Sequence, residues 1–265
     1  MSFTNYNHEY RRNKLAEPAQ LTDNADLWTP TVDQKHMLGA IFETNQGDEY
    51  RYCRADSTEI AKALLVQTPA YDDDQTCKVQ TLYGADAGST VFTVLATTGN
   101  GISDDELVDG YVLVSGTAVP AMGDLYIIKH NTWTTGDTVM RIEIADAGGL
   151  RNAIAATDDV SYFKNQFMDV IVKPTTLTAP IVGCTTTIIP ASYYAWIKTK
   201  GVTSILRDET DTIIVGDPVG HIDATTAVGC IGLVATSATD VILGTCLFPS
   251  AVSEATLINL QIPGV

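Results

Sequence analysis

Positive charge is scarce in this sequence. Its 265 residues include 16 Lys and Arg against 32 Asp and Glu, which gives a formal net charge of −16. Proteins that bind nucleic acid neutralise backbone phosphates with Lys and Arg, and anionic membrane surfaces attract basic segments. The charge therefore argues against a nucleic-acid or a membrane partner, and it suits a partner with a basic surface.

Catalytic and metal-binding motifs are also missing. The chain has no G-x-S-x-G, Walker or H-E-x-x-H motif and no dinucleotide fingerprint. Its four histidines are scattered, and its five cysteines include no C-x-x-C pair, so the spacings fit no zinc pattern. We therefore predict no catalytic residue, no metal and no cofactor, although a carboxylate pair for glycoside hydrolysis would leave no such motif.

Two acidic clusters could in principle bind a hard cation through carboxylate oxygens. One lies at residues 72–74 in YDDDQ, and the other at residues 104–109 in SDDELVD. Neither has the spacing of an EF-hand loop, and neither stands beside a plausible base or nucleophile. We interpret both clusters as solvated loops.

We find no clear targeting signal or membrane span in the sequence. The opening residues MSFTNYNHEYRRNK contain no apolar core of a signal peptide, which predicts a cytoplasmic product whose cysteines are reduced and mostly small core residues. The apolar segment 224–248 has a single charge, Asp240, and the length of a transmembrane helix. Its glycines and its many Thr and Ser instead favour two buried strands joined by a tight turn.

The residues that are abundant favour an all-β fold. The chain contains 35 Thr, and Val and Ile are also frequent; β-branched residues prefer strands. Short apolar runs alternate with Gly, Pro, Asp and Asn at the spacing of a sandwich or barrel. We predict a β-sandwich or β-barrel body of about fifteen short strands, which could form two β domains. The best helix candidate near the middle is a single turn in GGLRNAIAATDD.

The first 35 residues differ from the rest, so we predict an extended N-terminal arm over 1–35 and a β-rich body over 36–265. A subdivision of the body is expected near residues 175–190. A terminus of this kind can be disordered, but the arm is basic before Glu17 and carries several aromatic anchors, which favours a peptide that docks on a partner. The residues expected to make this contact are Tyr6, Tyr10, Arg11, Arg12, Lys14 and Trp28.

The stretch YYAWIKTKGV, residues 193–202, places large aromatics beside two of the few lysines. In a strand, alternate side chains share a face. Tyr193, Ala195 and Ile197 form the better core face, so we expect the opposite face to meet a neighbouring subunit or domain, with Trp196 more buried in an assembly than in one chain. That face holds Tyr194, Trp196, Lys198 and Lys200.

A weak echo links this stretch to residues 50–54. YRYCR and YAWIK share the pattern aromatic, any, aromatic, apolar, basic. Each precedes a turn of small residues and then an apolar strand. The echo suggests two strands of similar design in similar places of two halves of the protein.

The order of segments resembles virion structural proteins of tailed bacteriophages, of the type that decorate or cement the capsid. The likeness covers roughly residues 38–248 and lies in strand texture: GYVLV followed by GDLYIIKH, then NQFMDV, YYAWIKTKG and closing VG strands. The matching positions are Gly110, Tyr111, Tyr126, Ile128, His130, Asn165, Phe167, Val170, Tyr193, Tyr194, Trp196, Thr199 and Gly201.

The resemblance implies a β-rich protein on the capsid exterior that performs no chemistry. It implies two partners, the major capsid protein and further copies of the same chain in a homotrimer, and a role in locking the shell. The main alternative is a tail-associated or host-recognition protein that binds glycans through exposed Tyr193, Tyr194 and Trp196. An unrelated binding module, a shell subunit and an enzyme also stay open.

Overall fold

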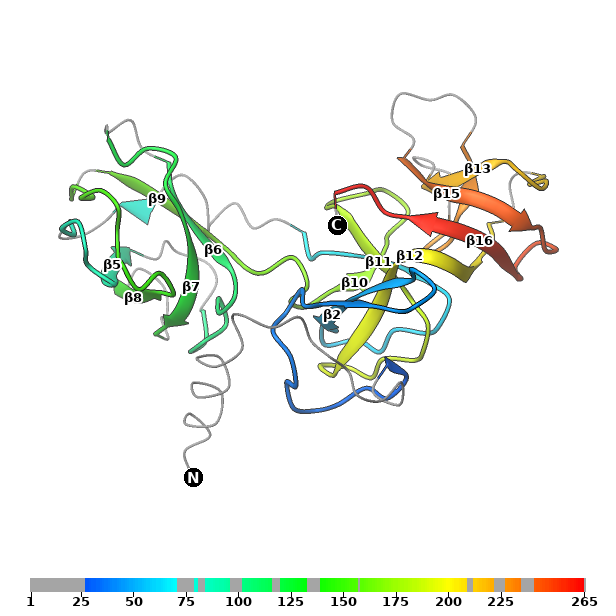
Figure 1. Cartoon of the computed structure of the whole chain (residues 1–265), viewed down its shortest axis with the longest axis horizontal. Coiled ribbons are helices and arrows are strands. Elements are labelled where there is room, and N and C mark those ends of the chain that lie inside the picture. The colour runs from blue at the N-terminus through cyan, green and yellow to red at the C-terminus, as the bar shows by residue number, and fades with distance from the viewer. Residues whose placement is uncertain are drawn as a thin grey trace. The chain divides into compact units, whose positions relative to one another are not determined.

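The computed structural model describes residues 27–70, 79–80, 84–95, 102–115, 120–132, 139–156, 158–208, 212–221, 227–234 and 241–264. The described residues form sixteen strands and no α-helix, so the predicted all-β fold is confirmed. The strands belong to two compact units (Figure 1). Unit 1 comprises Met1–Ala70 and Gln166–Val265, and unit 2 comprises Tyr71–Asn165.

Unit 1 contains a ten-stranded antiparallel sheet with the main order β10-β3-β11-β12-β16-β15-β13-β14, to which β2 adds by pairing with β12 and β1 by pairing with β2. Its strands from the first half of the chain are β1 (Ile41–Glu43), β2 (Glu49–Arg54) and β3 (Leu65–Gln67). The others are β10 (Ile171–Val172), β11 (Ile181–Thr185), β12 (Tyr194–Leu206), β13 (Pro218–His221), β14 (Gly232–Leu233), β15 (Val241–Phe248) and β16 (Ala255–Gln261).

Unit 2 contains a six-stranded antiparallel sheet in the order β4-β9-β6-β7-β8-β5. The sheet curls so that its two edge strands, β4 and β5, come close to each other. The strands are β4 (Val79–Gln80), β5 (Val91–Leu95), β6 (Tyr111–Val114), β7 (Leu125–Asn131), β8 (Val139–Ile144) and β9 (Asp159–Phe163). Curling of this kind protects strand edges that would otherwise pair with other chains.

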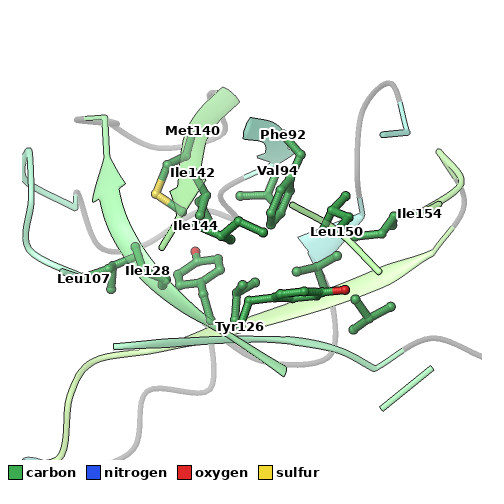
Figure 2. Packing of buried hydrophobic residues seen from close by; sticks show 14 of the residues in the cluster. Phe92, Val94, Leu107, Tyr126, Ile128, Met140, Ile142, Ile144, Leu150 and Ile154 are labelled. Carbon is green, nitrogen blue, oxygen red and sulfur yellow. The ribbon is translucent and has the colours of Figure 1, made fainter. Parts of the chain in front are cut away.

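The core of unit 2 follows from alternation along these strands. In β8, the sequence VMRIEI buries Met140, Ile142 and Ile144 and turns Val139, Arg141 and Glu143 outward, which is the period of two expected of a strand. Figure 2 shows these three side chains packed with residues from β5, β7 and the loops, among them Phe92, Val94, Tyr126, Ile128 and Leu150.

The boundaries differ from those expected. The chain leaves unit 1 after Ala70 and returns at Gln166, so unit 2 is an insertion into unit 1. Its second boundary precedes the subdivision expected near residues 175–190. The sequence does not reveal this insertion, because both units consist of the same kind of short apolar strands separated by turn residues.

The segment 27–35 is not part of a separate arm. Leu27 is buried in the core of unit 1 with Trp196, and Thr31 exchanges two backbone hydrogen bonds with Tyr194, both 2.8 Å long. The backbone N–H of Lys35 donates to the hydroxyl of Tyr52 at 2.9 Å. The part of the predicted arm over residues 1–26 lies outside the described residues.

The segment GGLRNAIAATDD does not form the predicted helical turn. Gly149 adopts φ +71°, and Ile154 forms a bridge with Ala85, so this segment is an extended loop. Segment 224–248 does contain strands, β14 and β15, but β13 lies between them in the sheet. No helix among the described residues is long and apolar enough to cross a membrane.

Strand β12 organises unit 1. Its first half pairs with β2 and β11, and its second half, from Lys200 onward, pairs with β16. The register with β2 shifts between Lys198 and Lys200, and Gly201 follows with φ +102°. A Cβ on Gly201 would lie 1.8 Å from the Asp48 carboxylate. Only glycine therefore lets the β1–β2 turn reach β12 at this bulge.

We predict that Gly201→Ala destabilises the protein by about 3 kcal/mol or more, since it adds a clash with Asp48 to the cost of a left-handed backbone. Gly216→Ala is the matched control. Gly216 has a similar φ of +93° and open space where its Cβ would be, so we expect a loss of about 1 kcal/mol. Urea unfolding measures both, and equal losses would show that the Asp48 contact does not matter.

Candidate functional site

Trp196 lies in the core of unit 1. It is 1% exposed, and its ring centroid lies 5.1 Å from those of His36 and Tyr52 and 6.0 Å from that of Phe42. The expectation that Trp196 meets a neighbouring subunit is therefore wrong, and so is the exposed glycan-binding platform. Ala195 and Ile197 lie in the core, as the alternation of side chains predicted. The opposite face is buried as well, because β12 is an inner strand and both of its faces are covered at this point.

Lys198 is also buried, at 4% exposed. Its Nζ forms an ion pair with Asp48 at 2.8 Å and donates to the carbonyl oxygen of Val202 at 2.6 Å. It also lies 5.3 Å from the ring centroid of Tyr50. Burial, and then the Asp48 charge, raise the pKa of Tyr50 to about 12. Lys198 thus stabilises the junction of β2 and β12 and is not a surface contact.

The other two residues of the predicted contact face, Tyr194 and Lys200, differ in exposure. Tyr194 is half-buried and stacks on Tyr52 at 5.9 Å, while Lys200 is exposed. The echo between residues 50–54 and 194–198 has a different basis from the one expected. The two segments pair directly, with Tyr52 opposite Trp196, so they are neighbouring strands of one sheet and not equivalents in two halves.

The predicted arm contacts are mostly beyond the described residues. Tyr6, Tyr10, Arg11, Arg12 and Lys14 lie there, and their role stays a prediction. Trp28 is described and is 50% exposed, directly beside the buried Leu27. It remains available for a partner.

The acidic loop at residues 104–109 is tied to its own unit. Glu106 pairs with Lys164 at 2.6 Å and accepts from the N–H of Ser103 at 2.7 Å. Burial acts to raise the pKa of Glu106, but these hydrogen bonds outweigh it and the pKa is lowered. Asp105 contacts His130 at 2.5 Å. Within the described part of the chain, no three His, Cys, Asp or Glu residues group as metal ligands. The other cluster, residues 72–74, falls outside that part.

A buried polar cluster lies where the residue after β10 meets β3 and β13. Lys173 is 0% exposed and His221 is 1% exposed, and the Lys173 Nζ lies 3.1 Å from the His221 Nδ1. Burial lowers the pKa of Lys173 to about 8, against smaller opposing effects of Cys230 and Asp208. The backbone of Lys173 also bonds to Leu65 and Gly229, so the cluster belongs to the packing of three sheet segments.

The four described cysteines, Cys53, Cys184, Cys230 and Cys246, are free and buried. Burial raises the pKa of each thiol, which keeps the thiols protonated and unreactive at neutral pH. They are small core residues, as predicted.

The outer face of unit 2 is the clearest candidate for a contact surface. Tyr111 of β6 stands opposite Ile127 of β7 on one side and Phe163 of β9 on the other, and Leu113 stands opposite Leu125. Tyr111, Leu125 and Ile127 are 38%, 50% and 42% exposed, and the other two are half-buried. These five residues, which we call the outer band, form one apolar row across three strands and a shorter row beside it on β6 and β7. Contiguous exposed apolar surface of this kind marks interaction sites.

Unit 1 has a second exposed apolar area. The register of β15 against β16 shifts between Cys246 and Phe248, and this bulge turns Leu247 and Phe248 outward together, 41% and 69% exposed. Leu257, opposite Phe248, is 38% exposed. Bulges commonly re-aim side chains at functional surfaces. We call these three residues the bulge patch.

No protein-family model, no curated protein and no solved structure matches this chain. No relative points to the outer band, and only the register of the strands brings its residues together. Its signal was present in the sequence, because YVLV and LYII have apolar residues at both parities. Those runs predict strands, but without the register they do not reveal which side chains face out.

The lowered pKa of Lys173 gives a pH-dependent prediction. In the window between about 8 and the ordinary lysine value of 10.5, the unfolded chain holds a proton that the folded chain has released. Stability should therefore rise with pH in this window, as the cost of the buried charge is removed. We predict that the stability of the native sequence relative to Lys173→Met increases by about 1 to 3 kcal/mol between pH 7 and pH 10.

Urea unfolding at both pH values measures this difference. The exposed Lys200, changed to Met, is the matched control and should show no such dependence on pH. A constant difference between the native chain and Lys173→Met across the window would contradict a strained charge at Lys173.

Proposed function

We propose that this chain is a non-enzymatic structural protein of a tailed-phage virion. In this role it binds the outer surface of the capsid as a decoration or cement protein and stabilises the shell. The partners are the major capsid protein and further copies of the chain. The proposal combines the resemblance of residues 38–248 to such proteins with the character of the exposed surface.

The observation that carries the proposal is the outer band. An antiparallel sheet with one free face normally shows polar residues on that face, as β8 does with Arg141 and Glu143. At the five outward positions of the outer band, on β9, β6 and β7, the side chains are instead apolar. Such a surface gains free energy when another protein covers it, and a cement protein acts through buried area and shape complementarity.

The predicted arm adds a second contact of opposite charge. Arg11, Arg12 and Lys14 carry positive charge on a chain of net charge −16. Two linked contacts that are each weak bind strongly together, because the second forms at high effective concentration. Several copies around a symmetry axis would multiply the effect. The glycan-binding alternative has lost its support, since Trp196 is buried.

The first test is binding to shells. We expect the purified chain to co-sediment with empty shells assembled from the major capsid protein encoded in the same genome. Cryo-electron microscopy of virions should place its density on the capsid exterior between capsomers. Density confined to the tail, together with no co-sedimentation, would contradict the proposal.

The arm is tested by deletion of residues 1–24, which keeps Leu27 and the Thr31 pairing in place. We expect shell affinity to fall at least tenfold while the circular dichroism spectrum and the urea midpoint stay unchanged. The triple change Arg11→Glu, Arg12→Glu and Lys14→Glu tests the charge without shortening the chain. Unchanged affinity in both variants would show that the arm makes no contact. Deletion of residues 1–35 is unsuitable, because it removes Leu27 from the core.

A further inference from the structure

The outer band has a defined extent. Its five residues come from β9, β6 and β7, and the outward positions of β8 are Val139, Arg141 and Glu143. Glu143 is paired with Lys129 of β7, so an ion pair borders the band on the β8 side. The band is therefore an apolar strip with a charged border.

The unit that carries the band has a negative net charge. The sequence of unit 2, residues 71–165, holds fourteen acidic and five basic residues, a net charge of −9. Three of the basic residues already pair with carboxylates: Lys129 with Glu143, Lys164 with Glu106, and Arg151 with Asp124. The five basic residues cannot balance the fourteen acidic ones, so unit 2 as a whole is acidic.

This negative charge bears on which protein could cover the outer band. Two copies that met through their outer bands would bring two acidic units together, and like charges across an interface oppose association. A surface with an apolar centre and a rim of Lys and Arg would instead gain from both its centre and its rim. Charge complementarity therefore favours a different protein over a second copy.

We propose that the outer band is the docking face for a protein surface with an apolar centre and a basic rim. The proposal rests on the proposed function, under which that surface belongs to the outside of the capsid shell. It adds which face of the chain is in contact and the chemistry of the site that receives it.

A pair of substitutions at one position tests this. Ile127 is 42% exposed and lies in the band opposite Tyr111, so Ile127→Lys and Ile127→Glu both remove apolar contact without opening the core. Facing a basic rim, the new lysine is repelled and the new glutamate is attracted. We expect Ile127→Lys to weaken binding to the empty shells at least tenfold, and Ile127→Glu to weaken it only a few-fold.

The matched control is Val202 of β12 in unit 1, which is 50% exposed. Val202→Lys and Val202→Glu should both bind shells like the native chain, and circular dichroism should show that all four variants are folded. Binding of the native chain should also weaken as NaCl rises, since salt screens the rim charges.

The outcomes separate the two proposals. If the native chain binds no shells, the proposed function fails and this inference fails with it. If the native chain binds and both Ile127 variants bind as tightly as the native chain, only the docking face is wrong. If Ile127→Glu is weaker than Ile127→Lys, the basic rim is wrong. Self-association in analytical ultracentrifugation that the Ile127 variants abolish would identify a second copy as the occupant and overturn the inference.

Discussion

The pairing of β2 with β12 is the constraint on which the rest of unit 1 depends. It joins residues 49–54 to residues 194–200, on either side of the inserted unit 2, and it encloses Trp196, Tyr52 and the Lys198–Asp48 ion pair. A buried ion pair of this kind contributes little net free energy, but losing one partner is costly. Its effect here is to fix the register where β12 changes partners from β2 to β16.

Unit 2 can be inserted because unit 1 closes without it. Ala55 and Val170 lie in a parallel bridge, the N–H of Arg54 donates to Phe167, and the N–H of Val170 donates to Arg54. Arg54 also pairs with Asp169 at 2.6 Å. These contacts hold the two chain segments of unit 1 together shortly before the chain departs and after it returns. Each unit then packs its own core.

The sequence predicted the fold class well and the candidate site poorly, for one physical reason. Alternation of side chains is local, so the strands at residues 111–114 and 139–144, the first half of β12 and the core positions Ala195 and Ile197 could be predicted. The continuation of β12 past Gly201 to Leu206 could not, because a glycine after a strand usually indicates a turn. Whether the opposite face is covered depends on distant segments. Trp196 and Lys198 are buried because Tyr52, Phe42 and Asp48 arrive from elsewhere in the chain, and no local pattern contains that information.

A different pairing register of β6 and β7 would not remove the exposed apolar side chains of the outer band. In β6 and β7 the inward positions Val112, Tyr126 and Ile128 are already apolar and at most 4% exposed, so a shift by one residue would only exchange one apolar face for another. Strands that are apolar on both faces normally belong to sheets that are covered on both faces. In unit 2 the core of the curled sheet covers one face, and β8 shows that polar outward residues fit this sheet. The physical consequence is that the outward apolar side chains of β6 and β7 would gain free energy if a second surface covered them.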